Sequence, residues 1–204
     1  MTMHLEKREG SVTKTVAQNK VFRNGDVLRF RLTSKIAGYL YVLDHGTTGT
    51  TTALFPIASG AAANNSIAAD VSTLVPATGD GWFEVSGPSG FDVIYIMVSD
   101  RPINLPPAAP QTGTQAPAGT APLPPGLLPR CNDAIFKARG DCVDPSAGVA
   151  PLSPDSPVPR ELAPLAKTAA RDIILSEEGD GTAVKAGLSA KLPLIYTFRL
   201  AHLE

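Results

Sequence analysis

An adjacent acid and base, Asp44 and His45, are the residues of this chain best suited to acid–base chemistry. A hydrolytic triad needs a serine, a histidine and an acid to converge, with the serine on a strained turn. The chain contains no G-x-S-x-G motif, and the sequence GPSG at 87–90 is typical of a simple turn. We therefore interpret His45 as a histidine in a solvated loop and predict no catalytic residue. A ligand- or metal-binding enzyme domain that uses the Asp44-His45 loop is the alternative hypothesis.

The two cysteines, Cys131 and Cys142, lie close together in the sequence CNDAIFKARGDC. Two ligands without a nearby histidine cannot build a structural zinc site. Arg130 could favour a thiolate at Cys131, but a catalytic cysteine also needs a histidine partner, and none lies nearby in sequence. We predict a local disulfide, which would stabilise the fold by about 2–3 kcal/mol in the chain-entropy model. Two independent reduced thiols are the alternative.

Five aspartates fall in stretches that the sequence predicts to be turns or loops. Oxygen-rich loops at the ends of a β-sandwich can bind calcium, but the spacing here matches no known calcium loop. Aspartate in a turn usually serves the turn itself. We therefore predict no metal ligands and no cofactor. The five residues are Asp26, Asp44, Asp70, Asp80 and Asp92.

Aromatic side chains are the best candidates for a recognition surface. Tyr39 and Tyr41 are two residues apart on one predicted strand, so they share a face of that strand. Core packing explains most of the aromatic residues, Phe91 and Tyr95 among them. Trp82, next to Gly81, would be the best interaction anchor if it faces solvent. The predicted interaction surface consists of Trp82, Tyr39 and Tyr41.

The elements that would position these residues are short strands. Leu28, Phe30 and Leu32 alternate with polar residues, which predicts a half-buried strand. Residues 39–43 (YLYVL) are apolar on both faces, so this strand should lie centrally in a sheet. Further strands are predicted at 82–85 and 93–98. This spacing predicts an all-β fold, an antiparallel β-sandwich that is Ig-like or a partly open barrel.

Three regions differ in composition. Residues 11–104 carry the main strands, and residues 105–164 form a long Pro-rich excursion with a short helix at 133–139 and the Cys131–Cys142 loop. Residues 102–164 hold 15 of the 19 prolines, which remove backbone donors. Residues 171–202 return to strand-like patterning, with Leu194, Tyr196, Phe198 and Leu200 on one face. If residues 171–202 formed a separate unit, it would have about 35 residues and too little core to fold alone. We therefore predict one composite domain over 11–202, in which the last strands pair along an edge of the first sheet.

Charge and hydropathy limit the kinds of function and the cellular location that we expect for this protein. A formal net charge of −1, from 18 basic and 19 acidic residues, gives no electrostatic footprint of a nucleic-acid binder. No apolar run approaches the ~20 residues that span a bilayer. The N-terminus, MTMHLEKREGSV, shows no signal peptide, while Leu203-Glu204 resembles a cloning remnant. We expect a periplasmic or extracellular protein whose signal has been removed, with a cytoplasmic protein as the alternative.

Residues 20–104 resemble the bacterial family known as domain of unknown function 4384. The resemblance implies a small β-sandwich found on envelope-associated bacterial proteins, with no established reaction and no agreed catalytic residues. The later sequence Ala147-Gly148-Val149 and the final strand resemble longer family members, less specifically. The matching residues are Phe22 with Gly25-Asp26, Gly38-Tyr39-Leu40-Tyr41-Val42, Leu54-Phe55-Pro56, Asn64-Asn65 with Ile67, Pro76 and Phe83.

We therefore expect a non-catalytic binding or interaction module of the bacterial cell envelope. Its partner would be another envelope protein or a surface polymer, bound through a face of the sandwich or through the Pro-rich arm, because proline tracts dock into aromatic grooves. A structural subunit of a surface assembly, with the proline segment packed along a neighbour, is a further alternative.

Overall fold

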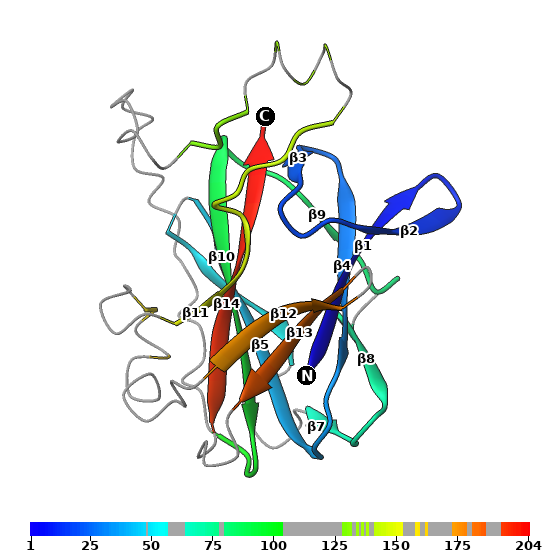
Figure 1. The fold of residues 1–204 in the computed structure, drawn as a ribbon, viewed down its shortest axis with the longest axis vertical. Helices are drawn as coiled ribbons and strands as arrows, with labels where there is room; N and C mark the ends of the chain where they lie inside the picture. The colour runs from blue at the N-terminus through cyan, green and yellow to red at the C-terminus, as the bar shows by residue number, and fades with distance from the viewer. Residues whose placement is uncertain are drawn as a thin grey trace.

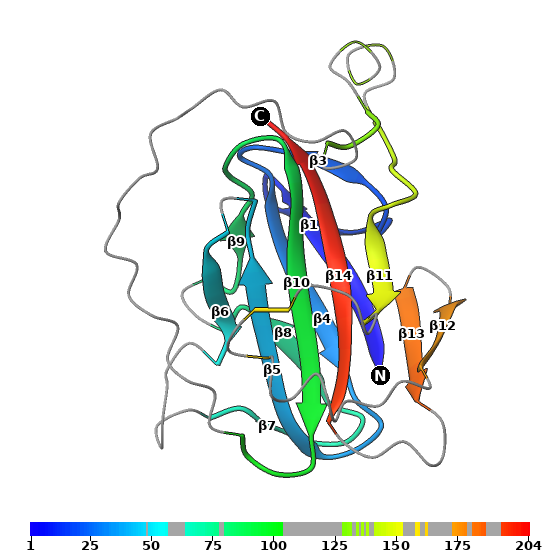
Figure 2. The same cartoon turned by 90° about the vertical axis from the view of Figure 1, so that its left-hand side faces the viewer.

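The protein is an all-β sandwich of two sheets packed face to face (Figures 1 and 2), as its strand pattern predicts. The computed structural model describes residues 1–47, 49–56, 64–77, 80–103, 128–131, 134, 136, 138, 141–152, 158–159, 162, 173–178, 181–186 and 193–204. Within these residues there are fourteen strands, and neither sheet closes into a barrel. No helix in this part of the chain is long and apolar enough to span a membrane.

The first sheet, called sheet 1, combines the N-terminal strands with two late ones. Its strand order is β12-β13-β1-β4-β8, with β2 beside β1 and β9 beside β4. The bounds are β1 (Thr2–Glu9), β2 (Val12–Val16), β4 (Val27–Thr33), β8 (Ser72–Val75), β9 (Phe83–Glu84), β12 (Ile173–Glu178) and β13 (Gly181–Ala186).

The second sheet, called sheet 2, contains the two longest strands. Its order is β11-β14-β10-β5-β6, with β7 beside β5 and β3 running parallel to β14. The bounds are β3 (Val21–Arg23), β5 (Gly38–His45), β6 (Thr51–Phe55), β7 (Ser66–Ile67), β10 (Gly90–Ser99), β11 (Gly148–Pro151) and β14 (Leu194–Leu203).

The main core lies between the sheets and is built by alternating side chains. In β4 the predicted residues Leu28, Phe30 and Leu32 point inward and are at most 1% exposed. β14 supplies the facing side chains, and Phe30 meets Phe198 edge to face with ring centroids 5.3 Å apart. The period-two patterns that predicted these inward faces are therefore confirmed, including Leu194, Tyr196, Phe198 and Leu200 on β14.

Strands from both ends of the chain complete the sheets. β14 pairs with β10 along nine residue pairs, and β13 pairs with β1. β1 lies outside the range 11–202 that the sequence predicts for the domain, because its outward-facing charged residues mask the inward alternation of Met3 and Leu5. The final strand thus adds to the edge of the sheet built by residues 11–104.

A second apolar cluster lies on the outer face of sheet 2. β5 and β10 are apolar on both faces, so the outward side chains also need a cover. Ile103, Leu152, Val158 and Leu162 supply it, and the side chain of Leu162 is 1% exposed. They cover Tyr41, Leu43, Tyr95, Met97 and Ile195.

The Pro-rich excursion therefore contributes to the packed structure. It contains β11, which the sequence does not predict and which ends at Pro151 on the edge of sheet 2, where a missing donor is tolerated. Of the predicted helix at 133–139, the structure describes Ala134, Phe136 and Ala138, all in helical conformation. Residues 104–127, which include the first part of the excursion, lie outside the described residues.

Candidate functional site

Trp82 lies on the outer face of sheet 1, and two arginines contact its ring. The guanidinium carbons of Arg29 and Arg8 lie 4.2 Å and 5.2 Å from the centre of its ring system, within the range of cation–π attraction. Arg29 points outward because its neighbours Leu28 and Phe30 point into the core. We call Trp82, Arg8 and Arg29 the Trp82 stack; its tryptophan is half-buried.

Acidic side chains hold the arginines in place. Glu6 accepts hydrogen bonds from Nε of Arg29 at 2.5 Å and from Nε of Arg31 at 2.7 Å, and Asp80 accepts one from Arg8 at 2.6 Å. Burial alone would raise the pKa of Glu6, but the hydrogen bonds and positive charges of Arg31 and Arg29 outweigh burial and lower it. The outer face of sheet 1 is therefore a fixed array of charges around one tryptophan.

Tyr39 and Tyr41 lie on the other side of the sandwich, so the structure does not bring the three predicted surface residues together. Tyr41 is 5% exposed, and its hydroxyl oxygen accepts a hydrogen bond from the backbone N–H of Ile103 at 2.6 Å. Tyr39 is half-buried against the same cluster. Both tyrosines thus serve the contact between sheet 2 and the excursion that covers it.

Asp44 and His45 point to opposite faces of β5, because successive residues of a strand alternate. Nδ1 of His45 lies 2.9 Å from Oγ1 of Thr51 on the paired strand β6. Asp44 points into the sandwich instead. The two side chains that the alternative enzyme hypothesis combines therefore do not share one site.

Asp44 instead joins Asp92 and His202 inside the sandwich, and we call these three residues the interior acid–histidine cluster. They come from β5, β10 and β14, which are neighbours in sheet 2, and Asp92 lies between the other two. Nε2 of His202 lies 3.4 Å from Oδ2 of Asp92. His202 is 0% exposed, and among the described residues neither its ring nitrogens nor Oδ1 of Asp44 has a hydrogen-bond partner.

Sequence reasoning missed His202. The signal that could have found it is the alternation of β14, since the inward face of Leu194, Tyr196, Phe198 and Leu200 continues to residue 202. Asp92 continues the inward face of β10 in the same way, two residues before Ile94. Their proximity depends on the register between strands, which pairs His202 with Gly90.

The cluster is unusual in its electrostatics. Burial, followed by repulsion from Asp92, raises the pKa of Asp44 to about 7, although attraction to His202 lowers it in part. Such a carboxyl group exchanges a proton near neutral pH and is suited to acid–base chemistry.

Of the five aspartates considered for calcium binding, Asp44 and Asp92 lie in the interior cluster, and the other three are paired with basic residues elsewhere. Asp26, Asp70 and Asp80 pair with Lys7, Lys35 and Arg8 at 2.7, 2.7 and 2.6 Å. Across the described part of the chain, no three His, Cys, Asp or Glu side chains are grouped so as to hold a metal ion. These aspartates balance the charge of neighbouring basic residues instead.

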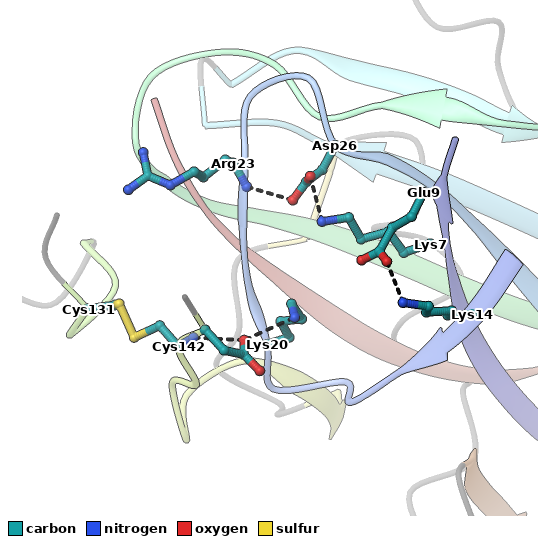
Figure 3. A network of polar contacts seen from close by, with 9 residues as sticks. Lys7, Glu9, Lys14, Lys20, Arg23, Asp26, Cys131 and Cys142 are labelled. Atoms are coloured by element: carbon teal, nitrogen blue, oxygen red, sulfur yellow. Dashed lines mark hydrogen bonds and ion pairs between the residues drawn. A yellow bond between two sulfur atoms is a disulfide. The ribbon is translucent and has the colours of Figure 1, made fainter. Parts of the chain in front are cut away.

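The predicted disulfide between Cys131 and Cys142 is confirmed, with Cα atoms 6.2 Å apart. Figure 3 shows it beside the segment that leads into β3. The carbonyl oxygen of Cys142 accepts a hydrogen bond from the N–H of Val21 at 2.8 Å, and Lys20 pairs with Asp141 at 3.0 Å. The disulfide loop is therefore attached to the edge of sheet 2.

Comparison with known proteins gives a family and no described relative. No curated protein matches the chain, and no solved structure matches it. The family model described as Domain of unknown function (DUF4384) matches residues 21–102, which run from β3 to β10. The resemblance predicted from the sequence is thereby confirmed over residues 21–102, the part of the chain that this family model matches.

Proposed function

We propose that the protein is a non-catalytic binding module of the bacterial cell envelope, which recognises another envelope protein or a surface polymer through the outer face of sheet 1. The observation that carries this proposal is the Trp82 stack. Tryptophan and arginine dominate the residues that supply binding energy at interfaces. A tryptophan already held in contact with two guanidinium groups loses little side-chain freedom on binding.

The surroundings of the stack support this choice of face. The side chains of Arg8, Arg31 and Asp80 are 36%, 37% and 61% exposed, so donors and acceptors surround the ring within reach of a partner. The outer face of sheet 2 is already covered by residues of the chain's own excursion. Sheet 1 therefore offers the better recognition face.

The disulfide supports the envelope location. Disulfides persist in oxidising compartments, such as the periplasm and the cell exterior, and are rare in the cytosol. Cys131 and Cys142 join two segments of the excursion that pack against β3. A protein whose packing includes such a bond fits an exported protein better than a cytosolic one.

The test is affinity capture: the full-length protein, either wild type or Trp82→Ala, is immobilised and exposed to native envelope extract. Recovered proteins and polymers are identified and purified, and their binding is measured by calorimetry. Deletion of residues 102–164 is not a clean test, because it would uncover the apolar outer face of sheet 2. Val143→Ala is the control, because it removes an exposed apolar side chain on the disulfide segment.

We expect a purified partner to bind the wild type and Val143→Ala equally and Trp82→Ala about 10-fold or more weakly, as for a central interface tryptophan. Equal binding by all three proteins would refute the role of the stack. If no partner is recovered in any form, the binding function itself fails.

A further inference from the structure

We propose that the interior acid–histidine cluster is a pH-sensitive contact that holds Gly46 and Thr47, at the start of the β5–β6 loop, on the end of the sandwich and releases them as the pH rises. This inference does not depend on the proposed binding function. It depends on the position of three titratable side chains from adjacent strands and on the backbone contact that one of them makes with the loop.

The strand register places the three side chains in one inward-facing row. Asp44 lies opposite Ile94, two residues from Asp92, and His202 lies opposite Gly90, two residues from Asp92 on the other side. Diagonal neighbours on one face of a sheet are within reach of each other. Because Gly90 has no side chain, it leaves room for the imidazole of His202 beside Asp92.

Asp92 connects the cluster to the loop. Its Oδ1 accepts a hydrogen bond from the backbone N–H of Thr47 at 2.8 Å, while its Oδ2 faces His202. Thr47 follows Asp44 by three residues, and the loop closes on itself through the N–H of Gly46 and the carbonyl oxygen of Thr50 at 2.9 Å. Any change that separates Asp44 from Asp92 therefore acts directly on the loop.

The charges around the cluster leave the two carboxylates to repel each other. The facing sheet presents the apolar residues Leu28, Phe83 and Val85. The charged residues at that end of sheet 1, Lys7 and Asp26, are paired with each other at 2.7 Å. From β3, Arg23 directs its guanidinium onto the ring of Phe136. The charges that act on Asp44 are those of Asp92 and His202.

Protonation decides whether this arrangement is favourable. With Asp44 protonated, only one carboxylate, that of Asp92, remains in the cluster beside His202. With Asp44 ionised, two carboxylates share a site in which Oδ1 of Asp44 has no hydrogen-bond partner. Water must then reach Asp44, and Gly46 and Thr47, which follow it closely in the chain, have to move for this to happen.

The sign of the pH dependence follows from Asp44. Its pKa is raised by burial and by Asp92 from the ordinary 3.8 to about 7 in the folded protein. Between these values the folded protein holds a proton that the unfolded chain has lost, so stability falls as the pH rises from 3.8 to about 7 and levels off above that. We expect the thermal midpoint of the wild type to be about 4–8 °C lower at pH 8.5 than at pH 5.5 from this group alone.

The test compares the wild type with Asp44→Asn, which keeps the shape and removes the titrating group. His45→Gln is the matched control, because His45 is the neighbour of Asp44 in β5 but points to the opposite face of that strand. Thermal midpoints are measured from pH 5.5 to 8.5 at constant ionic strength. Hydrogen exchange of the Thr47 amide is followed by NMR and corrected for the intrinsic pH dependence of exchange.

We expect Asp44→Asn to lose the 4–8 °C difference and His45→Gln to keep it. The protection of the Thr47 amide should fall about 10-fold or more with rising pH in the wild type and stay constant in Asp44→Asn. An unchanged pH profile in Asp44→Asn would overturn the proposal. If Asp44→Asn does not fold, the proposal is tested on the wild type by following the ¹³C resonance of the Asp44 carboxyl group with pH. Titration of this group near pH 4 would also overturn the proposal.

Discussion

Single residues decide how closely neighbouring strands of this sandwich approach each other, and Gly38 is the clearest case. A Cβ atom at this position would lie 2.4 Å from the carbonyl oxygen of Ser99, a backbone atom of the paired strand β10. Real Cβ atoms essentially never come so close. β5 can therefore begin beside the end of β10 only because residue 38 has no side chain.

Gly38→Ala should destabilise the protein by about 1–3 kcal/mol, because the added methyl group forces β5 and β10 apart. Urea unfolding followed by circular dichroism measures this change. Gly46→Ala is the matched control, since a Cβ there would make an ordinary contact of 3.5 Å with Asp92. Equal stability of both variants would show that β5 shifts without cost.

At the scale of elements, the excursion between β10 and β14 forms a partial third layer. Sheet 2 has two apolar faces, and its outer face is covered by side chains that a cysteine loop and β11 bring into place. Leu162 is the most deeply buried of the covering residues. The proline-rich stretch thus acts on the fold through a few buried side chains at its ends.

Leu162→Ala should cost about 2–4 kcal/mol, because it opens a gap over Tyr41 and Tyr95, and it should increase the binding of a hydrophobic dye. Leu128→Ala, in which the removed side chain is 47% exposed, serves as the control and should change stability by less than about 0.5 kcal/mol. Dye fluorescence and denaturant midpoints measure both effects. If the two variants behave alike, the described contacts of Leu162 do not hold the excursion on sheet 2.

A separate prediction concerns the disulfide in the Pro-rich excursion. Replacing both Cys131 and Cys142 by serine should lower the free energy of unfolding by about 2–3 kcal/mol, because a short loop in the unfolded chain is no longer closed. Denaturant unfolding with and without reductant gives the same comparison on the wild type. Titration of two free thiols in the native, unreduced protein would contradict the bond.

Strands could be predicted from the sequence where the hydrophobic pattern that defines them lies within the strand itself. The alternation of Leu28, Phe30 and Leu32 and the two-sided apolar strand at 39–43 define β4 and β5, because each pattern lies within one strand. β1 was hidden, since Glu6 and Arg8 face outward and give its sequence the appearance of a charged terminus. β11 was hidden by the prolines around it.

The interior acid–histidine cluster and the Trp82 stack could not be predicted in this way, because each forms through the register between paired strands. Asp44, Asp92 and His202 are separated by long stretches of sequence and meet only because β10 pairs with both β5 and β14. Arg8 and Arg29 reach Trp82 in the same way, through the pairing of β1 with β4 and of β4 with β9. A period-two pattern gives the face of a residue but not its neighbours across strands.

At the scale of the whole molecule, the DUF4384 region is not an independent sandwich in this chain. Residues 21–102 supply β3 to β10, whereas β1, β13 and β14 come from outside that range. Phe30 and Phe198, which join the two sheets in the core, lie on either side of this boundary. The main core is thus shared between the family region and the flanking sequence.

A fragment of residues 21–102 should therefore fail to fold alone, since it loses the inward faces of β1 and β14. Near-ultraviolet circular dichroism and one-dimensional proton NMR of the fragment, with the full chain as reference, measure this. A cooperative thermal transition and dispersed methyl resonances in the fragment would show that the family region has a sufficient core of its own.

The central place of β14 also sets the order in which the nascent chain acquires structure. β14 leaves the ribosome after every other strand of sheet 2, yet it lies between β10 and β11. Until β14 is synthesised, β10 has an open edge, and its inward residues Ile94, Ile96 and Val98 lack the side chains that face them from the final strand. A chain in which β14 is not yet in place therefore exposes this apolar face of β10, and protection against aggregation is needed until β14 has paired with it.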